Sequence, residues 1–314
     1  MINTSFNPHA ISYAILSVAD FESALDLWGR RFGMHCLLHR RGTDTELSRI
    51  WGLGPEEIVE QALLVTPGLA QSGIHLVRFR SPGAPVRVGA ASTDLVPKSV
   101  DIAVRDIFAR YAELEAAGFR FRSKIGRFET DGIVVHEVHM TGPDEVNLVF
   151  LEEAAKPAHV SPEGYGVAPQ IIATSPDNLR EKAFFEQVME LEETSYHRFG
   201  GPEVERTIGL PAGACLDVRI FGDAEFPHGR LEIVQYEGVV SSNLYPRAVA
   251  PARGLLGVSF GVSNLDAIAE RARRFGSPFQ AHGECTTLFG RRRLATVHSP
   301  AGLRVDLLES PAVA

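Results

Sequence analysis

Residues 11–33 read ISYAILSVADFESALDLWGRRFG, a short apolar strand that leads through an acidic residue into an amphipathic helix. The spacing of the apolar residues changes at Asp20 from a period near two to a period near 3.6. Asp20 is a favourable helix N-cap, and Gly33 suits the left-handed position that ends many helices. The pattern returns at residues 99–118, where Asp106 follows SVDIAV and Gly118 closes the helix. Each stretch predicts a strand followed by a helix.

The pattern occurs twice more because the chain is a tandem duplication. Asp177 lies 157 residues after Asp20, and EVERTIGL at residues 203–210 lies at the same distance from ELSRIWGL at residues 46–53. A repeat of this kind indicates two copies of one structural unit.

The duplication predicts two domains separated by a short linker. The sequence between the copies, EEAAKPAHVSPEGYG, is rich in Ala, Pro, Glu and Gly, as expected of a domain boundary. We therefore expect a first domain at residues 1–153, a linker at 154–165 and a second domain at 166–314, with the two repeats at 9–153 and 166–310.

Composition excludes several classes of function. The chain has 314 residues, 45% hydrophobic and 22% charged, and a net charge of −8 with Lys and Arg scattered along it. These values are ordinary for a globular protein and disfavour a nucleic-acid partner. No leader or membrane span is visible, and the three cysteines lack CxxC spacing. We expect a cytoplasmic protein with a small-molecule partner, no membrane or nucleic-acid partner, and a homodimer as one possible assembly.

Four strand–Asp–helix units, together with a closing Pro-x-Gly-x-x-Val-acid strand, resemble the vicinal oxygen chelate superfamily. That group includes glyoxalase I, extradiol ring-cleavage dioxygenases and bleomycin resistance proteins. The resemblance covers nearly the whole chain and implies an α+β fold, with four βαβββ units forming two tandem half-barrel domains. It also implies a site on each concave face, with helices covering the convex face.

The resemblance places a candidate metal site in the second copy. The family's ligand positions fall on Gln170, Glu232, Gly257 and Asp306. Strand alternation independently points Glu232 away from Leu231 and Ile233, so that three oxygen-bearing side chains would converge. An amide and two carboxylates suit a divalent ion, with Mg, Mn, Zn, Ni and Fe not distinguished. The alternative is a metal-free cleft in which Asp306 pairs with Arg304 and Glu232 pairs with another basic residue.

The first copy predicts a different kind of site. The equivalent family positions carry Tyr13, His75, Ser99 and Val149, a poor set of metal ligands. Asp101 and His139 share the same expected concave face, because His139 alternates with Val138. Tyr13, His75, His139 and Asp101 would then serve metal-free acid–base chemistry, with Asp101 orienting one of the histidines. Each histidine alone also fits a purely structural role.

These residues predict a lyase or isomerase of the glyoxalase type. Such an enzyme would act on a small carbonyl or aromatic metabolite by acid–base or Lewis-acid chemistry, and we expect Thr296 and His298 to contact the substrate. The set of two His and one carboxylate that non-haem iron oxygenases use is missing, which disfavours oxygen activation. Two alternatives stay open: a metal-free binding protein of the resistance type, and an extradiol dioxygenase.

Overall fold

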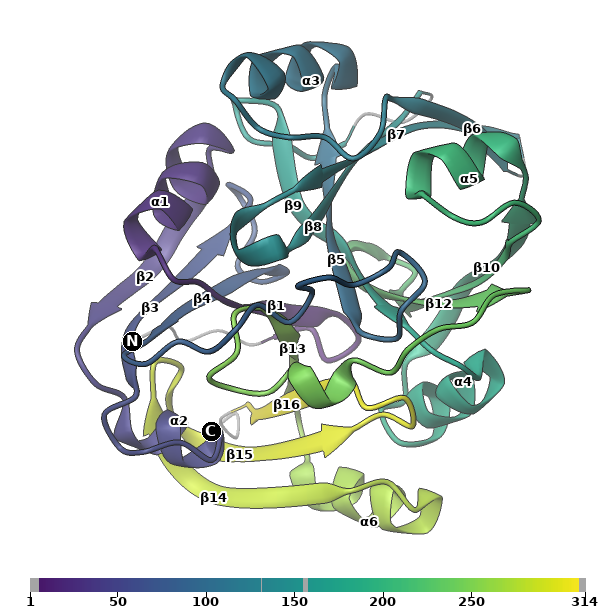
Figure 1. The fold of residues 1–314 in the computed structure, drawn as a ribbon. Coiled ribbons are helices and arrows are strands. Elements are labelled where there is room, and N and C mark those ends of the chain that lie inside the picture. Colours follow the sequence, from purple (N-terminus) through teal and green to yellow (C-terminus); the bar gives the residue numbers. More distant parts are fainter. Residues whose placement is uncertain (1–5, 131, 155–157, 311–314) are drawn as a thin grey trace.

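The protein forms two curled eight-stranded sheets, which confirms the predicted α+β class and the two half-barrels (Figure 1). This computed structural model describes residues 6–130, 132–154 and 158–310. One sheet has, in spatial order, β14 (Phe279–Thr287), β15 (Gly290–His298), β16 (Arg304–Glu309), β13 (Gly254–Val262), β1 (Ile11–Ser17), β4 (Gly73–Phe79), β3 (Ile58–Val65) and β2 (His35–Arg41). The other has β10 (Glu192–Gly200), β11 (Cys215–Asp223), β12 (Phe226–Glu237), β9 (Tyr165–Thr174), β5 (Pro97–Val104), β8 (Asn147–Glu153), β7 (Ile133–Thr141) and β6 (Gly126–Thr130).

The half-barrels do not follow the two sequence copies. The first and fourth units share one sheet, which we call the outer-pair sheet, and the second and third units share the other, the inner-pair sheet. The two seams are antiparallel, β1 against β13 and β5 against β9. Each half-barrel therefore takes one unit from residues 9–153 and one from 166–310, and the expectation that each copy builds its own half-barrel is wrong. The domain boundary at 154–165 stays a prediction, and residues 155–157 lie outside the described part of the chain.

Three helices begin at the Asp residues that the sequence predicts as N-caps, and a fourth begins at Asn264. The helices are α1 (Phe21–Leu25), which continues as the π-helical η1 (Asp26–Arg31), α2 (Thr45–Ile50), α3 (Ile107–Ala116), α4 (Asn178–Gln187), α5 (Pro202–Ile208) and α6 (Leu265–Phe275), with short 3-10 turns η2 (Pro143–Glu145) and η3 (Tyr245–Arg247). The side chains of Asp20, Asp106, Asp177 and Asn264 each accept the backbone N–H three residues ahead. Gly33, Gly118 and Gly276 take the positive φ angles expected at helix ends.

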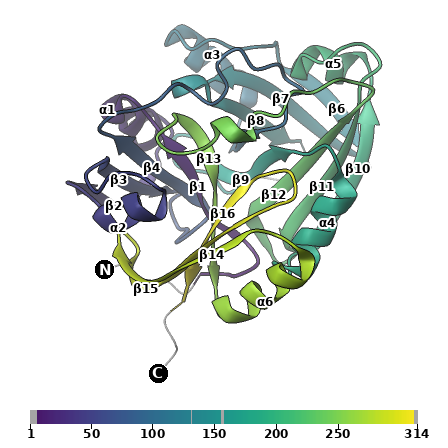
Figure 2. The same cartoon turned by 60° about the horizontal axis from the view of Figure 1, so that its bottom comes forward.

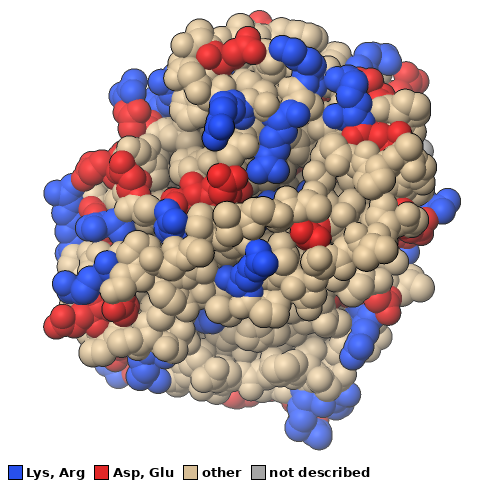
Figure 3. Space-filling view, in the orientation of Figure 1, with Lys and Arg blue, Asp and Glu red and all other residues tan. Residues whose placement is uncertain are grey.

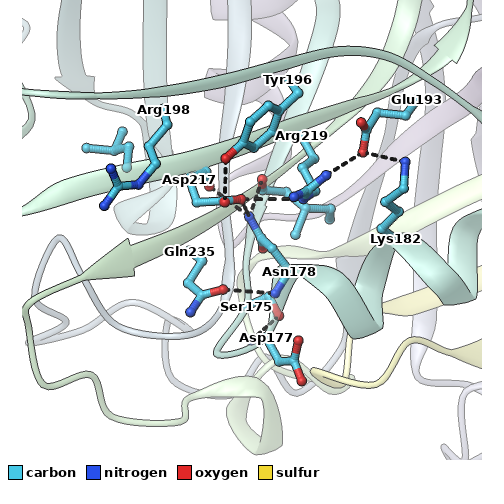
Figure 4. A network of polar contacts seen from close by, with 12 residues as sticks. Ser175, Asp177, Asn178, Lys182, Glu193, Tyr196, Arg198, Asp217, Arg219 and Gln235 are labelled. Atoms are coloured by element: carbon cyan, nitrogen blue, oxygen red, sulfur yellow. Dashed lines mark hydrogen bonds and ion pairs between the residues drawn. The ribbon is translucent and has the colours of Figure 1, made fainter.

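Helices α1, α3, α4 and α6 pack on the convex faces of the sheets, over the main apolar core. Figure 2 shows α4 and α6 on the outside of the molecule, and these two helices contact each other. Polar contacts also fasten α4 to the convex face of the inner-pair sheet (Figure 4). Asn178 Nδ2 donates to Asp217 Oδ1 at 2.7 Å, and Asn178 N donates to Gln235 Oε1 at 3.0 Å. These four helices therefore cover the convex faces and leave the concave faces open to other parts of the chain.

Two shorter helices cover the concave sides. Helix α5 belongs to the third unit and contacts β6 and β7 of the second unit as well as β10 of its own. Figure 1 shows α5 between β6 and β10. Helix α2 plays the same part in the outer-pair sheet, where it contacts β3 and β14. Each concave cleft is therefore closed by a helix of one unit that also contacts the edge strand of the other unit.

The charged surface is mixed. Figure 3 shows basic and acidic side chains interspersed over the face it presents, with no continuous basic area among the described residues of that face. No helix in the described parts of the chain is long and apolar enough to cross a membrane.

Candidate active site

Three polar side chains meet on the concave face of the inner-pair sheet. Gln170 Nε2 on β9 donates to Asp101 Oδ2 on β5 at 3.2 Å and to Glu232 Oε2 on β12 at 3.0 Å. Their neighbours Ile171 and Leu231 alternate to the other face, where both are fully buried in the core beneath the helices. The predicted orientation of Glu232 and Gln170 is therefore confirmed, and Asp101 joins them across the seam between units.

Desolvation makes both carboxyl groups weaker acids, although Asp101 is buried and Glu232 is half-buried. Desolvation, and next the negative charge of Glu232, raise the pKa of Asp101 well above its ordinary value. Desolvation, and next the charge of Glu137, raise the pKa of Glu232 to about 7. Glu232 therefore exchanges its proton near neutral pH, and Asp101 holds its proton more tightly than an ordinary aspartic acid.

A second polar cluster lies beside them. His139 Nε2 contacts Glu137 Oε1 at 2.8 Å, and His139 Nδ1 contacts Asn147 Nδ2 at 3.2 Å. Because an amide nitrogen only donates, Nδ1 accepts, and the proton of a neutral ring lies on Nε2 and points to Glu137. His139 is concave as predicted, but Glu137 and Asn147 orient it. The expectation that Asp101 does so is wrong.

Lys98 is a site residue that sequence reasoning missed. It lies on β5, three positions before Asp101, and only 4% of it is exposed. Simple alternation would place it with Val100 on the helix side, but the register of β5 against β9 shifts between Pro97 and Ser99. Its Nζ lies 4.3 Å from the ring centroid of Tyr236, on the concave side. The alternation of apolar and polar residues in the sequence does not show where a bulge occurs. The inward orientation of Lys98 could therefore be found only from the observed strand register.

A cavity of about 240 Å³ opens beside Gln170. Leu151, Gln170 and Arg230 line it, together with residues 158–159 and 227–228. Arg230 and Gln170 are direct neighbours in the parallel pairing of β12 and β9. The polar centre is therefore accessible to a small ligand from this end of the cleft.

The concave face of the outer-pair sheet is filled instead. Trp51 follows α2, and its Nε1 donates to Asp306 Oδ2 at 3.0 Å. Arg304 Nε donates to Asp306 Oδ1 at 2.9 Å, and Thr296 Oγ1 donates to the same oxygen at 2.8 Å. The space left beside Trp51 is about 20 Å³, roughly one water molecule. The predicted pairing of Asp306 with Arg304 is confirmed, and the indole ring occupies the cleft.

Tyr13 and His75 belong to this closed cleft. His75 Nε2 contacts Gln61 Oε1 at 2.9 Å, and burial lowers the pKa of His75 to about 3. Tyr13 is fully buried, and its hydroxyl donates to Ala70 O at 3.3 Å. A histidine that stays neutral at ordinary pH inside a filled core fits the structural role better than acid–base work.

Residues that we expected in one site therefore lie in two different clefts. Gln170 and Glu232 lie in the inner-pair sheet and Asp306 in the outer-pair sheet, so the expected convergence of these three residues is wrong. The expected grouping of Tyr13 and His75 with Asp101 and His139 is wrong for the same reason. The candidate substrate contacts Thr296 and His298 both lie on β15, in the sheet whose cleft Trp51 fills.

Comparison with known proteins agrees with this architecture. No family model and no curated protein sequence matches the chain. Among solved structures, glyoxalase I from Zea mays matches with a TM-score of 0.65 and 15% identity, over 96% of this chain and 92% of that one. The chain has the vicinal oxygen chelate fold. A Bacillus subtilis protein provisionally assigned as a dioxygenase also matches, with a TM-score of 0.58 and 11% identity, over 96% of this chain and 86% of that one.

The inner-pair cleft contains oxygen donors of the kind that divalent ions bind. Asp101 Oδ1 is buried without a hydrogen-bond partner among the described residues, and the amide of Gln170 lies between two carboxylates. Turning that amide over would present Oε1 beside the carboxylate oxygens. No group of three His, Cys, Asp or Glu residues suits a metal in the described chain, so the amide oxygen would have to be the third ligand.

Proposed function

We propose that the protein is an enzyme that transfers a proton on a small oxygenated metabolite, as a lyase or isomerase, in the inner-pair cleft. The observation that carries this proposal is the pair of carboxyl groups, the buried Asp101 and the half-buried Glu232, held on either side of Gln170 next to an open cavity. Strongly perturbed acids in a cleft are a common mark of a catalytic site.

Glu232 is the proposed acid–base residue. With a pKa of about 7 it exists in both protonation states near neutral pH, which is the condition that favours proton transfer in either direction. Gln170 Nε2 holds Glu232 Oε2 in place and leaves Oε1 for the substrate. Asp101, whose pKa is raised well above its usual range by desolvation, would be the proton donor.

In a metal-bound form these side chains would have a different role: Asp101, Glu232 and the turned amide of Gln170 would be ligands instead of acid–base groups, and the ion would supply Lewis-acid polarisation of a carbonyl or enolate oxygen. Among the described side chains of these clefts, no arrangement supplies the two imidazoles and one carboxylate of a non-haem iron oxygenase. In the inner-pair cleft, Glu137 and Asn147 occupy both ring nitrogens of His139. This ligand chemistry favours proton transfer over the dioxygenase alternative.

The test is hydrogen exchange in heavy water. Purified protein, with and without added Mn²⁺ or Zn²⁺, is incubated with a panel of small 2-oxo and 2-hydroxy compounds, and proton NMR follows loss of the signal alpha to the carbonyl. We expect exchange with at least one compound, and a loss of at least about 100-fold in Glu232→Gln, in line with the usual contribution of a general base. Asp306→Asn, in the closed cleft, is the matched control and should keep its rate.

Two results would contradict the proposal. Equal rates in Glu232→Gln and Asp306→Asn would remove the inner-pair cleft from the reaction. Tight binding of an aromatic compound without exchange of any panel member would favour the sequestering protein. Elemental analysis of the wild type and of Asp101→Asn tests the metal separately, because only a site that uses this carboxylate would lose its ion.

A further inference from the structure

Two buried cations lie at the end of the inner-pair cleft where β5 begins. Arg87 is 6% exposed and Lys98 is 4% exposed. The Nε and Nη1 atoms of Arg87 are buried without a hydrogen-bond partner among the described residues. Lys98 Nζ lies against the ring of Tyr236, and no described carboxylate is within ion-pair distance of either cation. A buried charge without a partner is costly and therefore needs an explanation.

Neighbouring polar groups are also left without partners. Ser99 on β5 pairs in register with Asn147 on β8, and Asn147 pairs with Thr141 on β7, so their side chains form one row across the concave face. Ser99 Oγ and Asn147 Oδ1 are buried and have no hydrogen-bond partner among the described residues. The row ends at Arg122, whose Nε donates to Thr141 Oγ1 at 3.1 Å. Arg122 is exposed and marks the side that faces solvent.

The electrostatics show that these cations act on one another. Burial, and next the charge of Arg122, lower the pKa of Arg87 to about 10. Burial, and next the charge of Arg87, lower the pKa of Lys98 to about 7. The carboxylates that act on Arg87 at longer range are Asp94 and Glu145, and those that act on Lys98 are Glu137, Glu232 and Asp101. Asp94 is already engaged, because it accepts the backbone N–H groups of residues 91 and 242.

We propose that Arg87 and Lys98, with Arg122 at the rim, form a subsite for an oxyanion, the carboxylate or phosphate group of the substrate. The inference rests on the proposed function and deepens it, because it names the substrate as an anion. An oxyanion would supply acceptors for the unpartnered N–H groups of Arg87 and for the ammonium of Lys98 through charge-assisted hydrogen bonds. The hydroxyl of Ser99 would donate to the same group. Asp101 lies three residues along β5 from Lys98, so the anion would lie next to the reacting centre.

The test measures anion binding directly, without an assay of turnover. Thermal unfolding of the full chain is followed at increasing concentrations of inorganic phosphate in one series and sodium malonate in another, at constant ionic strength. We expect one of the two to raise the unfolding temperature of the wild type, which identifies the group. Arg87→Met and Lys98→Met should each weaken the apparent affinity by about 10- to 100-fold, the usual loss for a charge-assisted hydrogen bond.

The matched control is Arg292→Met on β15, which removes a cation of the outer-pair sheet whose Nε and Nη1 are likewise buried without a partner among the described residues, and it should leave anion binding unchanged. Without added anion, Arg87→Met should unfold at or above the wild-type temperature, since it removes an unpaired buried charge. Binding that survives in both Arg87→Met and Lys98→Met, binding lost in Arg292→Met instead, or no response to either anion would overturn the proposal. Glu232→Gln should still bind the anion, so failure of the proton-transfer proposal would be seen separately.

Discussion

The buried side chain of Glu181 gives a quantitative prediction of how the free energy of unfolding depends on pH. It lies on the buried side of α4, where only 1% of it is exposed. Its Oε1 accepts hydrogen bonds from Ser299 Oγ at 3.2 Å and from the backbone N–H of Ala301, while Oε2 is buried without a partner among the described residues. Desolvation raises the pKa of Glu181 from 4.5 to about 7. The perturbation that tests this is Glu181→Gln, a neutral side chain of the same shape.

The sign and size follow from linkage. A carboxyl whose pKa is raised by folding binds its proton more tightly in the native state, so its stabilising effect is complete below about pH 4.5 and is lost as the pH rises through about 7. A difference of about 2.5 pKa units corresponds to about 3 kcal/mol at 1.36 kcal/mol per unit. Relative to wild type, Glu181→Gln should therefore gain up to about 3 kcal/mol between pH 5 and pH 8.

The assay is urea unfolding of both proteins at pH 5, 6, 7 and 8, with the free energy of unfolding extrapolated to water. Glu192→Gln, at an exposed position without an ion pair among the described residues, controls for a simple change of net charge. The difference between Glu181→Gln and wild type should widen with pH, while the control stays flat. Parallel curves for all three proteins would refute the assignment of a desolvated carboxyl at Glu181.

Three further expectations follow from the packing. Trp51→Ala should lower the free energy of unfolding by about 3–5 kcal/mol, because it empties the outer-pair cleft. Trp51→Phe, which keeps one ring in the cleft but loses the bond to Asp306 and part of the packing, should lower it by less; urea unfolding measures both. Asn264→Ala should cost about 1 kcal/mol through loss of the α6 N-cap, whereas Asn264→Asp should cost nothing, as thermal unfolding would show. The β1–β13 and β5–β9 seams both join the two copies. The separately expressed fragments 1–153 and 166–314 should therefore each self-associate. When the two fragments are refolded together they should form a 1:1 complex, which light scattering would detect.

Local structure was readable from the sequence because it depends on near neighbours. Asp20, Asp106 and Asp177 start helices since their side chains reach an N–H three residues ahead, whatever the rest of the chain does. The duplication revealed repeated units of strand and helix, and alternation correctly turned Gln170 and Glu232 to the concave side. The resemblance correctly implied the fold class.

Only the tertiary structure decided which units share a sheet. The edge strands of the four units offer the same backbone hydrogen-bond groups, so a sequence repeat cannot tell whether β1 pairs with β13 or with another seam strand. That choice moved Asp306 away from Glu232 and brought Asp101 to it from the other copy. The bulge that turns Lys98 inward and the indole of Trp51 that fills the second cleft depend likewise on contacts between residues far apart in sequence. The sequence by itself determined the units, and packing between the copies determined the site.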